Sequence, residues 1–180
     1  MLDPEVPQTA ARVRAIIRDV PDFPTPGILF KDITPLLADA AVLAASIKAM
    51  AAPYAGAGVS HVVGIESRGF LFGVPMALHL GAAFIPARKP GKLPWTTARE
   101  QYSLEYGSDA LEMHTDAFGV GARVLIVDDV LATGGTAAAA VRLCERLGAT
   151  VVGISVLTEL TFLNGRDRLD RTMVESVVQY

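Results

Sequence analysis

The sequence predicts an α/β fold with a central, mostly parallel sheet flanked by helices, and three observations support that prediction. The chain has 180 residues, of which 51% are hydrophobic, so it can bury one substantial core as a single domain over residues 1–180. Strand-like apolar runs alternate with helical stripes along the chain. The run "VLIV" at 124–127 is continuously apolar, as is typical of a strand covered on both faces. Such alternation implies parallel pairing through right-handed crossovers.

The apolar spacing predicts the helices and strands in chain order. A first helix is expected around Val13, Ile16, Ile17 and Val20, and a second from a cap at Asp39 through Val42, Leu43, Ile47 and Met50. A third is expected through Phe70, Val74, Ala77 and Leu78. The last is expected over 136–147, before Gly148. Strands are expected at 61–65, 82–87, 123–129 and 150–160, with an edge strand at 172–179. Alternation at 102–107 and 110–114 predicts an antiparallel hairpin.

Composition argues against several classes of partner and location. The net charge of -3 gives no basic surface for nucleic acid. The first ten residues lack the basic start and apolar core of a secretory signal, and the apolar stretch before Pro53 is interrupted at Lys48, too early for a membrane span. Cys144 is the only cysteine, so no internal disulfide forms, and we expect it to pack in the core of a cytoplasmic protein.

The stretch "VLIVDDVLATGGT" at 124–136 predicts a ligand site, because ligands of open α/β sheets bind beyond the carboxyl ends of the strands. The turn that follows leads into a helix, whose first N–H groups favour a phosphate. Asp128 and Asp129 would repel that phosphate, so they are expected to bind neutral hydroxyls or a ligand-bound cation. A sugar phosphate satisfies both requirements. The expected phosphate-binding residues are Ala132, Thr133, Gly134, Gly135 and Thr136.

Other interpretations of this stretch are weaker. An ordinary pair of solvated acids followed by a tight turn would explain the composition, but not the order of acids, small residues and helix start. The sequence contains no G-x-x-x-x-G-K-[ST] motif, so a P-loop is excluded. Glycine runs at Gly56 and Gly119 lack the third glycine of a dinucleotide fingerprint and are expected to be turns.

The same stretch closely resembles the phosphoribosyl diphosphate (PRPP) motif of the type I phosphoribosyltransferases. Segments along almost the whole chain resemble the members that act on adenine, in the same order: "DFPTPGILFKDITPLL", "ESRGFLFG", "RKPGKLP", "YSLEYG" and "LTEL". The resemblance implies that fold, with a small N-terminal hood formed mainly by about residues 1–35 and a mobile hairpin loop at about 88–108. It also implies the conversion of adenine and PRPP into AMP and pyrophosphate, a purine salvage reaction, by a homodimer that binds neither nucleic acid nor membrane.

The resemblance further implies roles for individual residues. The 132–136 loop would hold the 5'-phosphate, and Asp128 and Asp129 would hold the ribose hydroxyls and favour a cationic ribose. Glu105 would exchange a proton with the purine. Mg²⁺ would be bound through PRPP and pyrophosphate rather than by protein ligands. The expected pyrophosphate-binding residues are Ser67 and Arg68, in a loop that often has a cis peptide, with Arg88, Lys89 and Lys92.

Adenine recognition is expected from the hood. The resemblance implies that backbone groups of Leu29 read the purine edge, that Phe30 stacks on the ring, and that Lys31 and Val130 also contact the base. A fixed amide and carbonyl reject a 6-oxopurine, because its donor and acceptor pattern is reversed. The residues alone leave Phe30 open as a core aromatic. Lys31 stands where arginine is common, and Glu66 where some members have aspartate. The alternatives are an enzyme for hypoxanthine, guanine or xanthine, and a PRPP-sensing regulator with the same fold.

Overall fold

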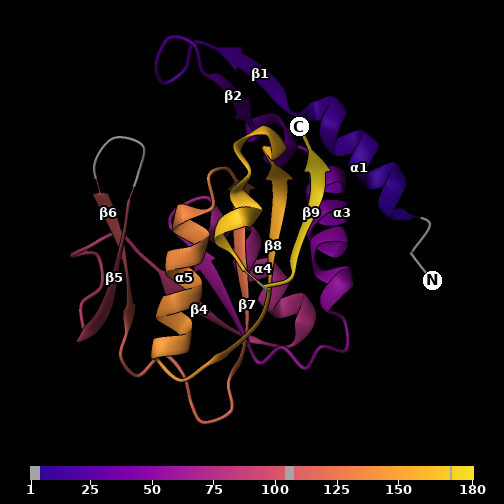
Figure 1. The fold of residues 1–180 in the computed structure, drawn as a ribbon. Coiled ribbons are helices and arrows are strands. Elements are labelled where there is room, and N and C mark those ends of the chain that lie inside the picture. Colours follow the sequence, from indigo (N-terminus) through magenta and orange to yellow (C-terminus); the bar gives the residue numbers. More distant parts are fainter. Residues whose placement is uncertain (1–4, 104–107, 171) are drawn as a thin grey trace.

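The computed structural model describes residues 5–103, 108–170 and 172–180 and places a five-stranded parallel sheet at the centre. The strand order is β4-β3-β7-β8-β9, and every neighbouring pair is parallel. The predicted parallel sheet and its edge strand are therefore confirmed (Figure 1). The strands are β3 (His61–Ile65), β4 (Ala83–Ala87), β7 (Arg123–Leu131), β8 (Thr150–Glu159) and β9 (Val174–Gln179).

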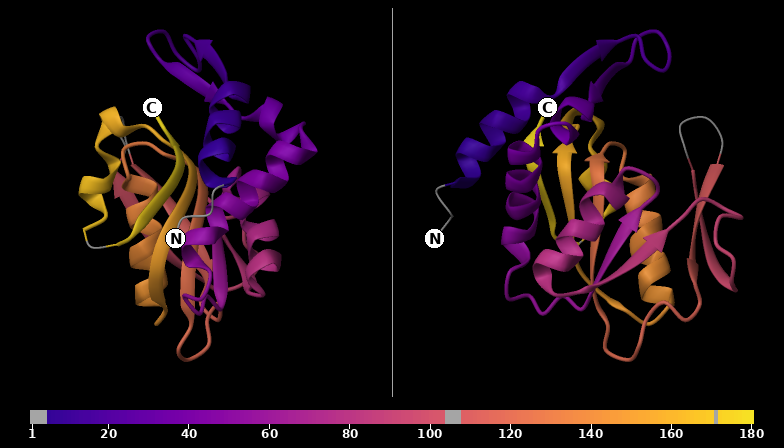
Figure 2. Two further views of the ribbon diagram at one scale, coloured as in Figure 1. Left: turned by 90° about the vertical axis from the view of Figure 1, so that its right-hand side faces the viewer. Right: turned by 180° about the vertical axis from the view of Figure 1, so that it is seen from behind.

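Helices cover both faces of this sheet. One face carries α1 (Glu5–Ile16), α3 (Ala40–Ala51) and α4 (Gly69–Leu80), and the other carries α5 (Gly135–Arg146), as Figure 2 shows. Asp39 caps α3 as predicted, because its carboxylate accepts hydrogen bonds from the N–H groups of Ala41 and Val42. Short helices join the main elements: α2 (Thr34–Leu37), η1 (Ala52–Tyr54), η2 (Thr161–Leu163) and η3 (Gly165–Arg168).

The first predicted helix is wrong at its end. It stops at Ile16, and Val20 lies instead in β1 (Arg18–Pro21), which pairs antiparallel with β2 (Leu29–Asp32). The reason is local, since a residue that precedes a proline is disfavoured in the helical region, and Pro21 follows Val20. The β1–β2 hairpin projects past the ends to which β8 and β9 point (Figure 1).

The predicted antiparallel hairpin is confirmed as β5 (Thr97–Ser103) and β6 (Ser108–His114), but its first strand lies earlier than the predicted 102–107. It contacts α5, so this helix is covered on its outer side. Between the hairpin strands, residues 104–107 lie outside the described structure.

The core consists of two apolar clusters, one on each side of the sheet. Val124 and Ile126 of β7 belong to the cluster under α5, whereas Leu125 and Val127 belong to the cluster under α3 and α4. All four side chains are fully buried, which confirms that this strand is covered on both faces. Within the described residues, no helix is both long enough and apolar enough to cross a membrane.

Candidate active site

A cavity of about 460 Å³ lies at the carboxyl ends of β3 and β7, where the sequence predicted a ligand site. Two chain segments form most of it: the turn after β3, and the stretch from the end of β7 into α5. The lining residues are Ile65, Glu66, Ser67, Arg68, Lys89, Asp128, Asp129, Val130, Leu131, Ala132, Thr133, Gly134, Gly135, Thr136, Ala137, Ile154 and Val156.

The turn from β7 into α5 forms one wall of the cavity. All five residues expected to bind phosphate, 132–136, line it. Gly134 has a φ of 79°, a left-handed conformation that glycine adopts without steric cost, and α5 begins at the next residue. Because Gly134 has no side chain to cap the helix, the N–H groups of the first turn remain available to an anion.

The two adjacent carboxylates at the end of β7 have different partners. Asp129 is only 5% exposed, and its Oδ2 forms an ion pair with Arg68 Nε at 2.6 Å. Asp128 accepts the backbone N–H of Asp129 at 2.8 Å. Burial, and then the negative charge of Asp129, raise the pKa of Asp128 well above its ordinary value of 3.8. Asp129 is therefore neutralised by a cation, whereas the neighbouring Asp128 binds a proton more readily than an ordinary aspartate.

The turn after β3 carries Glu66 and Ser67, joined by a cis peptide bond. The Glu66 carboxylate accepts two hydrogen bonds from Arg88, at 3.1 and 3.2 Å, and one from the backbone N–H of Lys89 at 2.9 Å. Burial alone would raise the pKa of Glu66, but these hydrogen bonds outweigh it and hold the pKa below its usual range. Glu66 thus joins the turn after β3 to the segment that follows β4.

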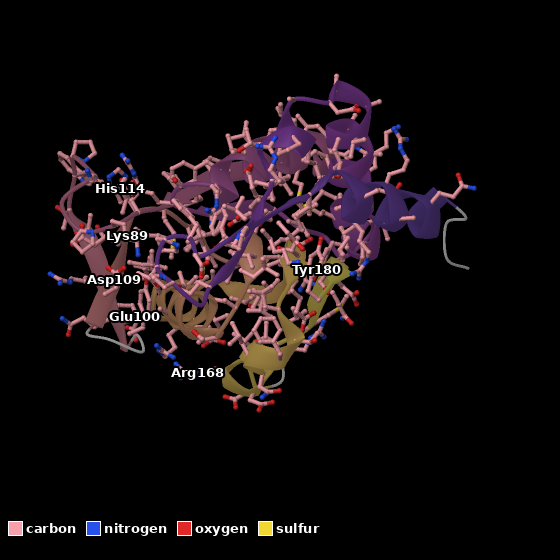
Figure 3. All side chains as sticks on the ribbon, turned by 90° about the horizontal axis from the view of Figure 1, so that it is seen from above. Lys89, Glu100, Asp109, His114, Arg168 and Tyr180 are labelled. Atoms are coloured by element: carbon pink, nitrogen blue, oxygen red, sulfur yellow. The ribbon has the colours of Figure 1, made fainter. Side chains whose placement is uncertain are left out.

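Lys89 connects the cavity to the β5–β6 hairpin. It lines the cavity, and its Nζ donates to Tyr102 at 2.8 Å and to Asp109 (Figure 3). Burial opposes the charge on Lys89, but the two hydrogen bonds prevail and raise its pKa. Lys92 lies at the edge of this group, where its carbonyl accepts from Arg88 at 3.1 Å.

The expected adenine-binding residues are not all together. Val130 lines the cavity, and Phe30 lies beside it, with its ring centroid 5.4 Å from the Arg68 guanidinium carbon. Leu29 is 52% exposed on the β1–β2 hairpin. Lys31 points elsewhere, since its Nζ lies 2.6 Å from Asp19 and 4.0 Å from the ring centroid of Tyr180. Glu105 lies outside the described residues.

Sequence analysis missed several members of the site. Glu66 was noted only as a departure, although it organises Arg88 and Lys89. Ile154 and Val156 of β8 line the cavity, but nothing distinguishes them from other apolar strand residues. The only sequence signal for Glu66 was its position, directly before Ser67 and Arg68. Among the described residues, no cluster of three or more acidic, histidine or cysteine side chains could hold a metal ion.

Comparisons with known proteins agree with this geometry. A model of the phosphoribosyl transferase domain matches residues 30–178. The adenine phosphoribosyltransferase of Myxococcus xanthus is 58% identical over 94% of this chain and 92% of its own length. That of an Anaeromyxobacter species is 60% identical over 93% of this chain and 95% of its own length.

Solved structures of similar proteins have the same fold. A crystal structure of adenine phosphoribosyltransferase from Rhodothermus marinus superposes with a TM-score of 0.92 at 52% identity, over 97% of this chain and 99% of that one. The Saccharomyces cerevisiae adenine phosphoribosyltransferase, solved with an imino-altritol bisphosphate and adenine, gives a TM-score of 0.91 at 39% identity. The match covers 95% of this chain and 99% of that one.

Proposed function

The chain belongs to the phosphoribosyl transferase domain family, and on that premise we propose that its cavity converts adenine and PRPP into AMP and pyrophosphate, a step of purine salvage. One observation supports this most strongly. An acid pair and an uncapped helix N-terminus lie in one cavity at the carboxyl edge of the sheet. That combination suits a ligand that carries both hydroxyls and a phosphate.

The ribose 5-phosphate part of PRPP is assigned to the β7–α5 wall. The backbone N–H groups and hydroxyls of residues 132–136, the phosphate loop, bind the 5'-phosphate. Asp128 and Asp129 accept hydrogen bonds from the ribose hydroxyls. As the bond at C1 breaks, positive charge builds on the ribose, and carboxylates stabilise that charge.

The leaving pyrophosphate is assigned to the cationic wall. Ser67 and Arg68 contribute from the turn after β3, and Arg88, Lys89 and Lys92 from the segment after β4. Negative charge accumulates on the leaving group, so fixed cations lower the barrier. Arg68 is bound to Asp129 in this structure, and the phosphates offer it an alternative partner.

Magnesium is proposed to enter with PRPP. The carboxylates that line the cavity are Glu66, Asp128 and Asp129. Glu66 is already bonded to Arg88, and Asp129 to Arg68. This donor set suits a cation whose ligands come largely from phosphate and ribose oxygens, as Mg²⁺ prefers. When bound, the ion neutralises part of the phosphate charge.

Adenine is assigned to the space between the hood and the cavity. Phe30 offers an aromatic face beside Arg68, Val130 lines the cavity below, and backbone groups of Leu29 read the purine edge. Lys31 acts indirectly, through its contacts with Asp19 and Tyr180, by holding the hood. We assign the proton exchange with the purine to Glu105, and we propose that the loop at about 88–108 closes over the site and excludes water.

The working assembly is proposed to be a homodimer in the cytoplasm. An apolar stripe on α4 supports the dimer: Leu71, Val74 and Leu78 share one helix face and are 46%, 43% and 79% exposed. α4 begins directly after the Ser67–Arg68 turn, so an interface there would be continuous with the site. The single cysteine, Cys144, is buried and free, as suits a reducing compartment.

The reaction is tested with purified protein, PRPP and Mg²⁺, offering adenine, hypoxanthine, guanine and xanthine separately. We expect AMP and pyrophosphate from adenine alone. Turnover of a 6-oxopurine would contradict the hood assignment and leave the PRPP site intact. Binding of PRPP without turnover of any base would indicate a regulator. Glu105→Gln is expected to lower kcat by about 100-fold with little change in the KM for PRPP.

A further inference from the structure

Gly165, the first residue of η3, touches the phosphate loop backbone to backbone. A methyl group at Gly165 would lie 2.2 Å from the carbonyl oxygen of Ala132 and 3.1 Å from the nitrogen of Gly134. A methyl group at Gly134 would lie 2.1 Å from the carbonyl oxygen of Gly165. Neither site has room for a side chain. Gly165 is buried and is not among the residues that line the cavity.

An ion pair between the buried Glu159 and the half-exposed Arg166 lies beside this glycine. Glu159 ends β8 and is 4% exposed, and its two oxygens accept from Arg166 at 2.6 and 2.8 Å. Ser176 and Gln179 of β9 donate to the same carboxylate, at 2.7 and 3.2 Å. Among the described residues, the donors to the Glu159 carboxylate therefore come from β9 and from η3.

The ion pair and the phosphate loop are attached to the same point of the sheet. Glu159 pairs in register with Leu131, the residue directly before the loop, and Leu160 N–H donates to the Leu131 carbonyl at 2.9 Å. Arg166 directly follows Gly165. A bidentate contact to a carboxylate fixes both distance and orientation, so Glu159 and Arg166 determine how closely Gly165 approaches the loop.

We propose that Glu159 and Arg166 are positioning residues for PRPP, which press Gly165 against the phosphate loop and so hold its N–H groups in the geometry that binds the 5'-phosphate. This rests on the assignment of the 5'-phosphate to that loop. Hydrogen bonds weaken steeply when donors shift or tilt, and sites built from backbone donors depend on the residues that support them.

Gly165→Ala tests the contact directly. Gly165 is not among the residues with positive φ, so alanine there has no left-handed backbone strain, and the three atoms nearest to its methyl group all belong to the loop. Gly119→Ala is the matched control, because Gly119 also lacks a positive φ and a methyl group there would have no atom within 4 Å. Gly119 lies in the connection between β6 and β7, before the amino end of β7.

Calorimetry with ribose 5-phosphate and with pyrophosphate gives the readout. We expect Gly165→Ala to weaken ribose 5-phosphate binding by about tenfold or more, since a displacement near 1 Å is costly in a pre-organised site. Pyrophosphate, assigned to the opposite wall, should bind within about twofold of the unaltered protein. Gly119→Ala should change neither affinity.

Arg166 variants test the ion pair without touching the loop. Arg166→Lys keeps the charge but not the bidentate contact, and Arg166→Gln loses both. We expect the KM for PRPP to rise in the order arginine, lysine, glutamine, with an unchanged KM for adenine. A purely structural role would lower the melting temperature and kcat without separating the two KM values.

The outcomes are distinct. If the unaltered protein binds pyrophosphate but not ribose 5-phosphate, the assignment of the phosphate loop fails, and this inference fails with it. If the unaltered protein binds ribose 5-phosphate and Gly165→Ala binds it equally well, only the present inference is overturned. Equal weakening of both ligands, or equal rises in both KM values, also overturns it.

Discussion

The adjacent carboxylates of Asp128 and Asp129 lie in a largely enclosed position, and they are unequal because one has a cation and the other does not. Arg68 pairs with Asp129 at 2.6 Å, whereas Asp128 has the negative charge of its neighbour beside it. An acid whose pKa is raised on folding stabilises the protein below its usual pKa, and that contribution is lost as pH rises through the raised pKa. At neutral pH, the burial of the Asp128 carboxylate therefore lowers the free energy of unfolding of the ligand-free enzyme.

Asp128→Asn is expected to make the ligand-free enzyme more stable and less active. The amide carries no charge, so the gain in the free energy of unfolding should be larger at pH 8 than at pH 5, reaching about 1 kcal/mol or more. Urea unfolding at both pH values measures it. The AMP-forming activity should fall by about 100-fold. Asp129→Asn is the control, because it removes a carboxylate that Arg68 stabilises. An equal gain in the free energy of unfolding in that variant would contradict the explanation.

Helix α3 illustrates how one side chain defines the start of an element. Asp39 accepts from the N–H groups of Ala41 and Val42 at 2.9 and 3.0 Å, so two groups at the helix start are satisfied. Asp39→Ala is expected to lower the free energy of unfolding by about 1 kcal/mol, whereas Asp39→Asn, which keeps an accepting oxygen, should cost less. Chemical denaturation separates the two, and equal losses would exclude the cap as the cause.

The β1–β2 hairpin is held to the sheet through an aromatic ring. Tyr180 follows β9, and its backbone is held by Glu159 and Thr161. Two cations contact its ring, with the Arg14 guanidinium carbon at 4.8 Å and Lys31 Nζ at 4.0 Å from the centroid. Tyr180 therefore links α1, β2 and the end of the sheet, and it helps to place the proposed adenine-binding residues over the cavity.

Tyr180→Leu should loosen this link and weaken adenine recognition. Each cation–π contact contributes about 0.5–1 kcal/mol, so losing both predicts a KM for adenine about three- to tenfold higher, with an unchanged KM for PRPP. Steady-state kinetics with each substrate varied provides the measurement. Tyr180→Phe is the control, because the buried hydroxyl has no hydrogen-bond partner among the described residues. The explanation fails if phenylalanine has the same effect as leucine.

At the scale of the whole molecule, the parallel sheet gathers the site and leaves one apolar helix face uncovered. Parallel strands bring their carboxyl ends to one edge, so the turns after β3 and β7 meet although they are about sixty residues apart in the chain. On α4, Phe72 and Met76 are fully buried against the sheet, while the stripe of Leu71, Val74 and Leu78 is exposed. A second copy of the chain is the proposed cover for this stripe.

Leu78→Glu is expected to convert the proposed dimer into a monomer. A charge in the centre of an apolar interface has no partner to offset its desolvation, so association should weaken by at least about 100-fold. Sedimentation velocity over a range of protein concentrations tests this. Val120→Glu changes an exposed apolar residue outside α4 and should leave the assembly as it was. A wild-type monomer, or an unaltered dimer in Leu78→Glu, would contradict the assignment.

Features encoded by neighbouring residues were predictable from the sequence. The alternation of apolar runs and helical stripes predicted the parallel sheet, the hairpin and the cap at Asp39. The position of the cavity wall at 132–136 was predictable because the segment is contiguous, so its acids, glycines and helix start appear together in the chain. The end of the first helix was mispredicted, although Pro21 was a local signal that favoured an extended Val20.

Contacts between distant segments were decided only by the tertiary structure. Glu66 holds Arg88 across 22 positions, Lys31 reaches Tyr180, and Gly165 meets Gly134 where neither tolerates a side chain. No periodicity encodes such contacts, because they depend on how strands and turns pack in space. The sequence by itself therefore determined the fold class and the local chemistry of the site. The tertiary structure determined which charges neutralise one another and that Gly165 packs against the backbone of the 132–136 turn.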